Sequence, residues 1–263
     1  MNINKPHDTF FKQLMADPHV LKDFITATFP EDIVKALDLH SLKIIDTEKA
    51  NRKYKKYFLD ITVQCKLLDK DSEIYIVFEH KSYPDKLTLI QFLNYFSVVW
   101  EEDIRNNRNP RPIIPVLFYH GKIKFNLPDR FIEYFKVNEN FKKYLLDFSY
   151  ILFDTNKYKD EEILKLSENM YLVAGLLMFK NIFRDVKEMK PVLRKVLEIG
   201  DERILMVFDY LVMAKDIEEE EFEKLIREVG GEKMASLAQR WMEKGKIEGL
   251  KRAIKIGLKL KFG

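Results

Sequence analysis

The chain has 263 residues, and its 45 Lys and Arg against 42 Asp and Glu leave a formal net charge of only +3. This balance does not by itself indicate a nucleic-acid partner. A single cysteine, Cys65, excludes an internal disulfide framework and favours a reducing compartment. The longest apolar run, residues 171–179, is about half of what a bilayer requires, and the polar N-terminus lacks a signal-peptide core. We therefore expect a cytoplasmic protein without a membrane span.

The N-terminal third of the chain changes from a helical to an extended pattern. Residues 8–29 carry apolar side chains near helical spacing, and Pro18 is expected to interrupt this helix after Asp17. Residues 31–37 suit a second short helix. Residues 41–45 are typical of a strand or the approach to one. Two stronger strand predictions follow at residues 57–66 and 73–81, joined by turn-forming residues.

The middle of the chain predicts a helix followed by one more strand. The helix is expected to open at Pro84 and Asp85 and to end near residues 106–110. Residues 113–121 form a short apolar run, which predicts a strand buried on both faces and paired parallel to a neighbour across the helix. Pro115 argues against complete ladder pairing there. After about residue 155 the pattern indicates only helices. We expect one domain at residues 1–154 and a helical C-terminal region with a basic tail at residues 155–263.

Three charged residues in the two stronger predicted strands suggest a catalytic site. Asp60 stands in an apolar strand, where a carboxylate is costly without a partner, and Glu79 follows five apolar residues. Glu79 and Lys81 share one strand face, whereas His80 points away. If the strands pair as a hairpin, two carboxylates and an ammonium group meet at one edge of a sheet. Oxygen ligands suit Mg²⁺, and a lysine can orient the attacking water. The alternative without a function is that Asp60 and Glu79 are solvent-facing acids, Asp60 on an edge strand and Glu79 at a strand end.

Several segments in order resemble one known family. Asp60, Glu79-x-Lys81 and Gln91-x-x-x-Tyr95 resemble the PD-(D/E)XK nuclease superfamily with its QxxxY helix motif. Four further segments are similar to the Rpn group, labelled recombination-promoting nuclease or putative transposase: Pro6-His7-Asp8-x-x-Phe11-Lys12, Glu79-His80-Lys81-Ser82, Phe118-Tyr119-His120-Gly121 and the glycine-spaced tail at residues 243–249. The usual proline before the first acid is absent, since Leu59 precedes Asp60, but it is often missing in the superfamily.

The resemblance implies an α/β fold with a restriction-endonuclease-like core. That core is a mixed four-stranded sheet flanked by helices, and an all-helical C-terminal half follows it. The implied activity is Mg²⁺-dependent cleavage of DNA. Our leading hypothesis is an endonuclease of low sequence specificity, with Mn²⁺ as the alternative ion. The implied context is recombination or mobile elements.

Each candidate residue receives a role under this hypothesis. Asp60, Glu79 and the backbone carbonyl of His80 would bind the metal, and Lys81 would hold the water or the scissile phosphate. Gln91 and Tyr95 lie one helical turn apart on the same side of the helix. They would contact the DNA backbone or brace the metal ligands, unless Tyr95 belongs to the core.

Other residues are weaker candidates. His7 and Asp8 could support the site, although Asp8 equally suits a helix N-cap. His120 beside a glycine is more typical of a turn. A basic connector could gather DNA by releasing its counterions, or could be a solvated loop; its residues are Arg52, Lys53, Lys55 and Lys56.

Two other classes of function stay open. A non-catalytic DNA- or protein-binding module could retain the same fold, and a transposase would need strand transfer as well as cleavage. The expected partners are DNA and a second copy of the chain in a homodimer, without a membrane. The basic tail at residues 244–261 suits a second DNA contact, a dimer helix or a frayed end. Zinc-ligand spacing and a Walker loop are both missing from the sequence.

Overall fold

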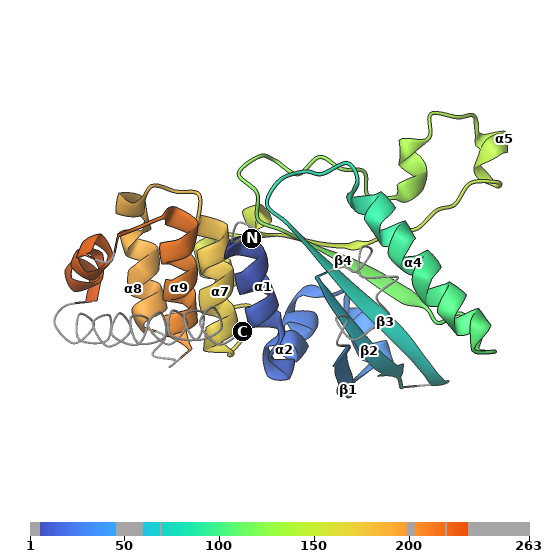
Figure 1. Ribbon diagram of the computed structural model, residues 1–263, viewed down its shortest axis with the longest axis horizontal. Coiled ribbons are helices and arrows are strands. Elements are labelled where there is room, and N and C mark those ends of the chain that lie inside the picture. The colour runs from blue at the N-terminus through green and yellow to red at the C-terminus, as the bar shows by residue number, and fades with distance from the viewer. Residues whose placement is uncertain (1–5, 46–59, 69, 199–202, 219, 231–263) are drawn as a thin grey trace, which may run out of the picture. The chain divides into compact units, whose positions relative to one another are not determined.

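The computed structural model describes residues 6–45, 60–68, 70–198, 203–218 and 220–230 (Figure 1). The chain divides into two compact units, residues 1–180 and residues 181–263. Residues 155–180, which the sequence placed with the C-terminal region, thus fall in the first unit. The division into two domains stays a prediction. Among the described residues, no helix combines the length and the apolar character that crossing a membrane requires.

The first unit is built on a five-stranded mixed sheet in the order β1-β2-β3-β4-β5. Strands β1, β2 and β3 pair antiparallel, while β3, β4 and β5 pair parallel. The strands are β1 (Leu37–Ile45), β2 (Ile61–Leu67), β3 (Lys70–Lys81), β4 (Ile113–Tyr119) and β5 (Ile151–Asp154). The α/β class is therefore confirmed, but the sheet has one strand more than the four expected. The short β5 was missed because four residues carry too little periodicity to read.

Helix α4 (Thr88–Arg105) connects β3 to β4 and covers one face of the sheet (Figure 1). It begins four residues after Pro84, and the Asp85 carboxylate accepts the backbone N–H of Leu87 at 2.9 Å. Strands β3 and β4 are parallel, as predicted, with Val77 opposite Pro115. Pairing with β5 starts only at Val116. Pro115 therefore lies where β4 has a partner strand on one side, and a missing N–H costs least there.

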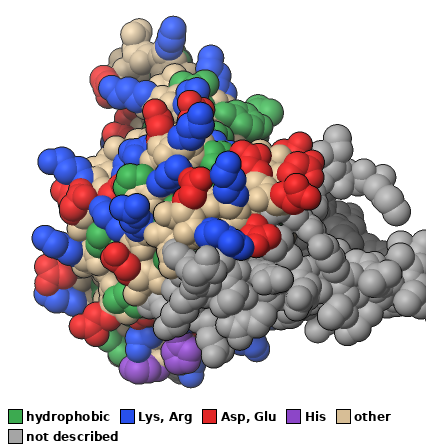
Figure 2. Space-filling view, turned by 90° about the vertical axis from the view of Figure 1, so that its left-hand side faces the viewer, with side chains coloured by type: hydrophobic (Ala, Val, Ile, Leu, Met, Phe, Trp, Pro, Cys, Tyr) green, Lys and Arg blue, Asp and Glu red, His purple; other side chains and the backbone are tan. Residues whose placement is uncertain are grey.

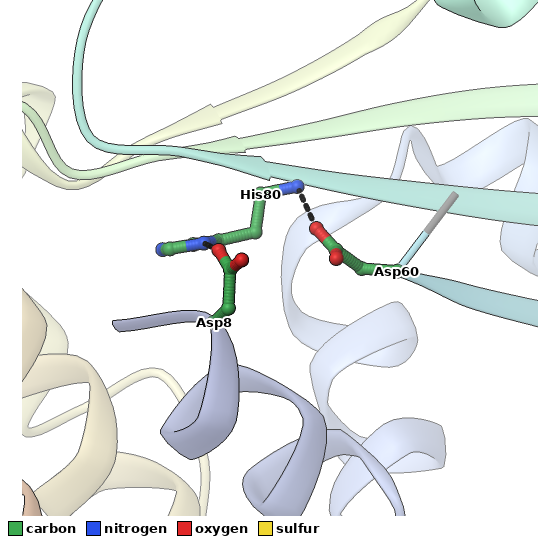
Figure 3. A group of neighbouring side chains, drawn as sticks. All are labelled: Asp8, Asp60 and His80. Carbon is green, nitrogen blue, oxygen red and sulfur yellow. Dashed lines mark hydrogen bonds and ion pairs between the residues drawn. The ribbon is translucent and has the colours of Figure 1, made fainter. Parts of the chain in front are cut away.

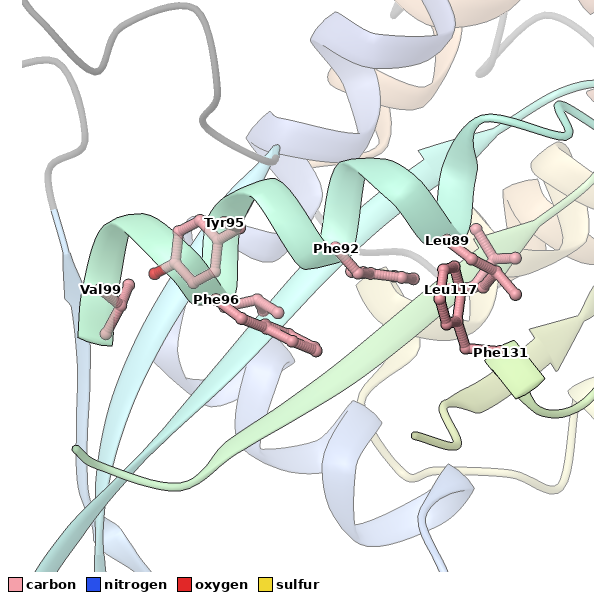
Figure 4. Close-up of a cluster of buried hydrophobic side chains, with 8 residues drawn as sticks. Leu89, Phe92, Tyr95, Phe96, Val99, Leu117 and Phe131 are labelled. Carbon is pink, nitrogen blue, oxygen red and sulfur yellow. The ribbon is translucent and has the colours of Figure 1, made fainter. Parts of the chain in front are cut away.

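The apolar face of α4 forms one half of the core (Figure 4). Its side chains recur every three or four residues, as expected for an amphipathic helix, and they pack on alternate residues of β3 and β4. The buried cluster contains Val77, Leu89, Phe92, Tyr95, Phe96, Val99, Leu117 and Phe131. Val77 is thus on the α4 side, so Glu79 and Lys81, two and four residues later, begin on that side as well.

Helices α1 (Pro6–Met15), α2 (Pro18–Thr28) and α7 (Met170–Asn181) pack on the other face of the sheet. The Asp17 side chain caps α2 by accepting the N–H of His19, which confirms the predicted interruption. Phe118 of β4 lies 5.1 Å from Phe11 and 5.0 Å from Phe179, ring centroid to ring centroid. The even-numbered side chains at the ends of β3 and β4, such as His80 and Phe118, therefore pack against these helices.

The remaining elements are short. The first unit also contains α3 (Glu31–Ala36), η1 (Phe131–Tyr134), α5 (Glu139–Lys142), η2 (Thr155–Lys157) and α6 (Asp160–Ile163). The second unit contains η3 (Val186–Met189), α8 (Lys190–Glu198) and α9 (Ile204–Lys215). No strand follows β5 in the described part of the chain, in agreement with the helical expectation. The basic tail lies outside the described residues.

The face drawn in Figure 2 does not separate its charges into large areas of one sign. On the face drawn in Figure 2, Lys and Arg side chains are intermixed with Asp and Glu side chains. This agrees with the nearly balanced composition of the chain.

A buried ion pair anchors the C-terminal end of α4. Asp103 is fully buried and accepts hydrogen bonds from the backbone N–H and the Nε of Arg111, both at 3.1 Å. Arg108 also pairs with it. Burial alone would raise the pKa of Asp103, but the hydrogen bonds from Arg111 hold it below its ordinary value.

We predict that Asp103→Ala destabilises the protein by about 3 kcal/mol, because it removes a fully buried carboxylate and leaves the partly buried guanidinium of Arg111 without its main hydrogen-bond acceptor. Glu101→Ala is the matched control on the same helix, since Glu101 pairs with Arg105 at the surface. It should cost less than about 1 kcal/mol. Chemical denaturation of both variants measures the difference, and equal losses would contradict the account.

Candidate active site

The pairing of β2 with β3 brings Asp60 to the end of β3. Ile61 pairs with Phe78 in the antiparallel ladder, so Asp60, one residue earlier, falls opposite Glu79. The Oδ2 of Asp60 accepts the backbone N–H of His80 at 2.9 Å (Figure 3). The hairpin on which the site hypothesis depends is therefore present, and its first acid is fixed to the backbone of the Glu79-His80-Lys81 segment.

Glu79 and Lys81 form an ion pair on the α4 side of the sheet. The Nζ of Lys81 lies 2.9 Å from Oε1 of Glu79 and 3.3 Å from Oδ2 of Asp85. Burial alone would lower the pKa of Lys81, but Glu79 and Asp85 raise it above its ordinary value, so the amine stays charged. Asp85 was not among the predicted site residues, although its position four residues after Lys81 could have indicated it.

Glu79 is the most strongly perturbed carboxylate of this region. Burial, together with the charge of Asp60, raises its pKa from 4.5 to about 7, although the nearby Lys81 ammonium acts in the opposite direction. The charge of Asp8 adds to the increase. Three carboxylates therefore act on one another here, and a positive charge placed among them would relieve their repulsion.

A second lysine pairs with the first acid. The Nζ of Lys12, on α1, lies 3.0 Å from Oδ1 of Asp60. Burial alone would lower the pKa of Lys12, but the charge and the hydrogen bond of Asp60 raise it. Lys12 belongs to the N-terminal segment that resembles the Rpn group, yet its contact with Asp60 could not be read from sequence spacing.

The side chain of His80 points to the opposite face of the sheet, as the strand pattern predicts. Its Nδ1 lies 3.2 Å from Oδ1 of Asp8, which rises from the first turn of α1 (Figure 3). Its Nε2 lies 3.0 Å from Nδ1 of His120, and its ring stacks on Phe11 at 5.0 Å. Helix α1 begins at Pro6, so Asp8 lies within its first turn rather than at the N-cap.

His120, for which the neighbouring glycine suggested a turn, directly follows β4. It is buried, it meets His80, and its ring centroid lies 4.9 Å from that of His7. Burial and the neighbouring histidines lower its pKa well below the ordinary value. Burial likewise lowers the pKa of His7 to about 4, with His80 contributing. His7 and His120 are therefore neutral at physiological pH.

Gly121 permits the close approach of the two strand ends. A Cβ atom at this position would lie 2.5 Å from the carbonyl oxygen of Ser82. Because the obstacle is backbone, a side chain there would displace the segment that follows Lys81. The Tyr119-His120-Gly121 run thus supplies a buried histidine and the space beside it.

A hollow of about 510 Å³ opens over this group. It is lined mostly by polar and charged residues, which come from α1, β3 and α4, from the position before β2 and from the segment that follows β3: Pro6, His7, Asp8, Asp60, Glu79, His80, Lys81, Ser82, Tyr83 and Gln91. The predicted residues Asp60, Glu79, Lys81 and Gln91 therefore meet at one place. Tyr95 does not line the hollow; it is 3% exposed and belongs to the core cluster of α4. Arg52, Lys53, Lys55 and Lys56 lie outside the described residues.

The donors around the hollow fit a divalent cation. Asp8, Asp60 and His80 each offer a ligand atom, and these atoms lie within 4.8 Å of one another. The Oε1 of Gln91 is buried and has no hydrogen-bond partner among the described residues. A buried carbonyl oxygen without a partner is costly, and a bound ion or its water would satisfy it.

The raised pKa of Glu79 predicts a pH-dependent stability of the metal-free protein. Glu79 titrates near 4.5 in the unfolded chain and near 7 in the folded one, so between these values only the folded state keeps the proton. Stability therefore falls as pH rises through this window. At about 1.4 kcal/mol for each pKa unit, we expect a loss of roughly 3–3.5 kcal/mol, which Glu79→Gln removes. Denaturant titrations in EDTA from pH 4.5 to 8 measure it; identical pH profiles for both proteins would contradict the assignment.

Comparison with known proteins finds relatives whose names all contain the words recombination-promoting nuclease. It is similar to Recombination-promoting nuclease RpnD of Escherichia coli O157:H7, with 34% identity over 44% of this chain and 45% of that relative. Inactive recombination-promoting nuclease-like protein RpnE of Escherichia coli strain K12 is 26% identical over 98% of this chain and 90% of its own. Recombination-promoting nuclease RpnC of the same strain is 23% identical, and the match covers 91% and 82% of the two chains.

The chain spans less than half of RpnD but most of RpnE and RpnC. No solved structure matches it. Residues 5–204 match the family described as "Putative transposase, YhgA-like". This match covers most of the chain, and the resemblance to the Rpn group is confirmed: the protein belongs to the YhgA-like putative transposase family, with relatives named recombination-promoting nucleases.

Proposed function

We propose that the protein is a Mg²⁺-dependent DNA endonuclease of low sequence specificity, linked to recombination or mobile elements, and that its sheet and flanking helices form a PD-(D/E)XK core. The observation that carries the proposal is the meeting of Asp60, Glu79 and Lys81 at one edge of the sheet, over a polar hollow. The names of two relatives, which are recombination-promoting nucleases, support it.

Asp60, Glu79 and the backbone carbonyl of His80 would hold the metal. When bound, Mg²⁺ would lower the pKa of a water molecule and offset charge on the phosphate. Mn²⁺, which also takes oxygen ligands, is the alternative ion. Binding would require Glu79 in its charged form, and the repulsion between Glu79 and Asp60 would then favour a cation between them.

Lys81 would act on the reacting groups rather than on the metal. Its ammonium group, held by Glu79 and Asp85, is charged and borders the hollow. There it can orient the water that adds to phosphorus, or bind a non-bridging phosphate oxygen as the phosphorus–oxygen bond to the leaving strand breaks. Gln91 is placed to contact a water or the DNA backbone through its unpartnered oxygen. For Tyr95, which is in the core, the role is support of α4.

A non-catalytic DNA- or protein-binding module is the second candidate. It is favoured by the name of RpnE, which is called inactive and which matches 98% of this chain. Against it stand the intact Asp60, Glu79 and Lys81 and their contacts. A transposase would join strands in addition to cutting them, so the same DNA assay would reveal joined products. The homodimer stays a prediction, because the structure describes one chain.

We predict that Asp60→Asn lowers Mg²⁺-dependent cleavage of plasmid DNA by at least about 100-fold, because it removes a ligand charge. The variant keeps an oxygen that can accept the N–H of His80, so its melting temperature should stay close to that of the parent. Asp32→Asn, an exposed acid of α3, is the control that should cleave normally. Cleavage by the parent must also stop in EDTA. An Asp60→Asn variant as active as the parent would exclude the assignment.

The variant Lys81→Met distinguishes binding of the metal from cleavage of the DNA. The variant should lose cleavage to a similar extent, since no other described ammonium pairs with Glu79, but it should still bind Mg²⁺ because lysine is not a ligand. Removing a nearby positive charge should in fact tighten metal binding. Thermal melting over a Mg²⁺ titration measures binding beside the cleavage assay. Lost metal binding in a folded Lys81→Met protein would refute this division of roles.

A further inference from the structure

A second set of metal-ligating atoms lies on the other side of β3 from Glu79. Asp8 comes from the first turn of α1, Asp60 precedes β2, and His80 stands near the end of β3 (Figure 3). Their ligand atoms lie within 4.8 Å of one another. All three residues border the hollow, so an ion can reach them from solvent.

The imidazole of His80 is held in a fixed position. Phe11 stacks on one side of it, and its Nε2 lies 3.0 Å from Nδ1 of His120. If Nε2 donates its hydrogen to His120, the lone pair of Nδ1 points toward Asp8, 3.2 Å away. Metal-bound histidines characteristically use their second nitrogen in such a hydrogen bond, which fixes the ring and its tautomer.

We propose that Asp8, Asp60 and the imidazole of His80 bind a second divalent ion, and that this site takes Mn²⁺, Co²⁺ or Zn²⁺ in preference to Mg²⁺. One nitrogen with two carboxylate oxygens suits these transition metals, whereas Mg²⁺ prefers oxygen ligands and retains its waters. Only the sharing of Asp60 between two ions rests on the proposed nuclease function. The ligand set itself does not require it.

Lys12 is the group that competes with this ion. Its ammonium lies 3.0 Å from Oδ1 of Asp60, and its side chain is 51% exposed. A flexible, half-exposed lysine can withdraw into solvent when a divalent ion binds. Removal of its charge should therefore strengthen the site, which is the opposite of what removal of a ligand does.

The experiment titrates the full chain, without a histidine tag, with Mn²⁺ in an excess of Mg²⁺. Electron paramagnetic resonance counts bound Mn²⁺, and its pulsed form detects coupling to ¹⁴N of a ligand. The parent should show one nitrogen-coupled ion. Glu79→Gln should keep this signal, because Glu79 is not a ligand of the second ion, and His7→Gln should keep it because His7 is a neighbour that does not bind.

Variants of the ligands and of Lys12 should change the affinity in opposite directions. Asp8→Asn should weaken the nitrogen-coupled ion by at least about 10-fold. Asp8 is 35% exposed, so this variant should fold even if the buried His80→Gln does not. In folded His80→Gln the ¹⁴N coupling should vanish. Lys12→Met should tighten the ion several-fold, while Lys22→Met, an exchange on α2, should not.

Three results would overturn the proposal: no ¹⁴N coupling in the parent, coupling that is lost with His7 instead of His80, or unchanged affinity in Asp8→Asn. The failure of the nuclease proposal would look different. The nitrogen-coupled ion would then persist in a protein that cleaves no DNA in any divalent metal.

Discussion

The hydrogen bond from the backbone of His80 to the carboxylate of Asp60 is the contact on which the site depends. It continues the antiparallel ladder of β2 and β3 by one residue, through a side chain instead of a carbonyl group. Because side chains alternate along β3, fixing this register places Glu79 and Lys81 on the α4 face and the His80 ring against α1. A shift of the β2–β3 register by one residue would move each side chain of β3 to the opposite face of the sheet, and the site would not form.

The same place gathers opposite charges that are incompletely balanced. Asp60 pairs with Lys12, and Glu79 pairs with Lys81, yet burial and repulsion still raise the pKa of Glu79. Such a site is less stable than a neutral one would be, and this is common where side chains are arranged for binding. A bound divalent cation would offset the repulsion between the carboxylates and so stabilise the site. The stability of the fold and its proposed activity therefore depend on the same carboxylates.

Much of this arrangement could be predicted from the sequence, and the missed contacts of Lys12, His120 and Tyr95 share one cause. Alternation and spacing were sufficient for β3, for α4 and for the convergence of Asp60 with Glu79. Alternation and spacing could not predict contacts between distant segments, because periodicity indicates only which face of its element a residue occupies. The burial of His120 and the pairing of Lys12 with Asp60 arise from the packing of α1 on one face of the sheet. Tyr95 is buried by the packing of α4 on the opposite face.

A crystal of the full chain soaked in Mn²⁺ would show directly whether Asp60 and Glu79 hold a metal ion. We expect an anomalous peak within about 2.3 Å of carboxylate oxygens of both Asp60 and Glu79. If no such peak appears at saturating Mn²⁺, or if it lies elsewhere while these two acids stay bound to Lys12 and Lys81, the two acids do not form a metal site.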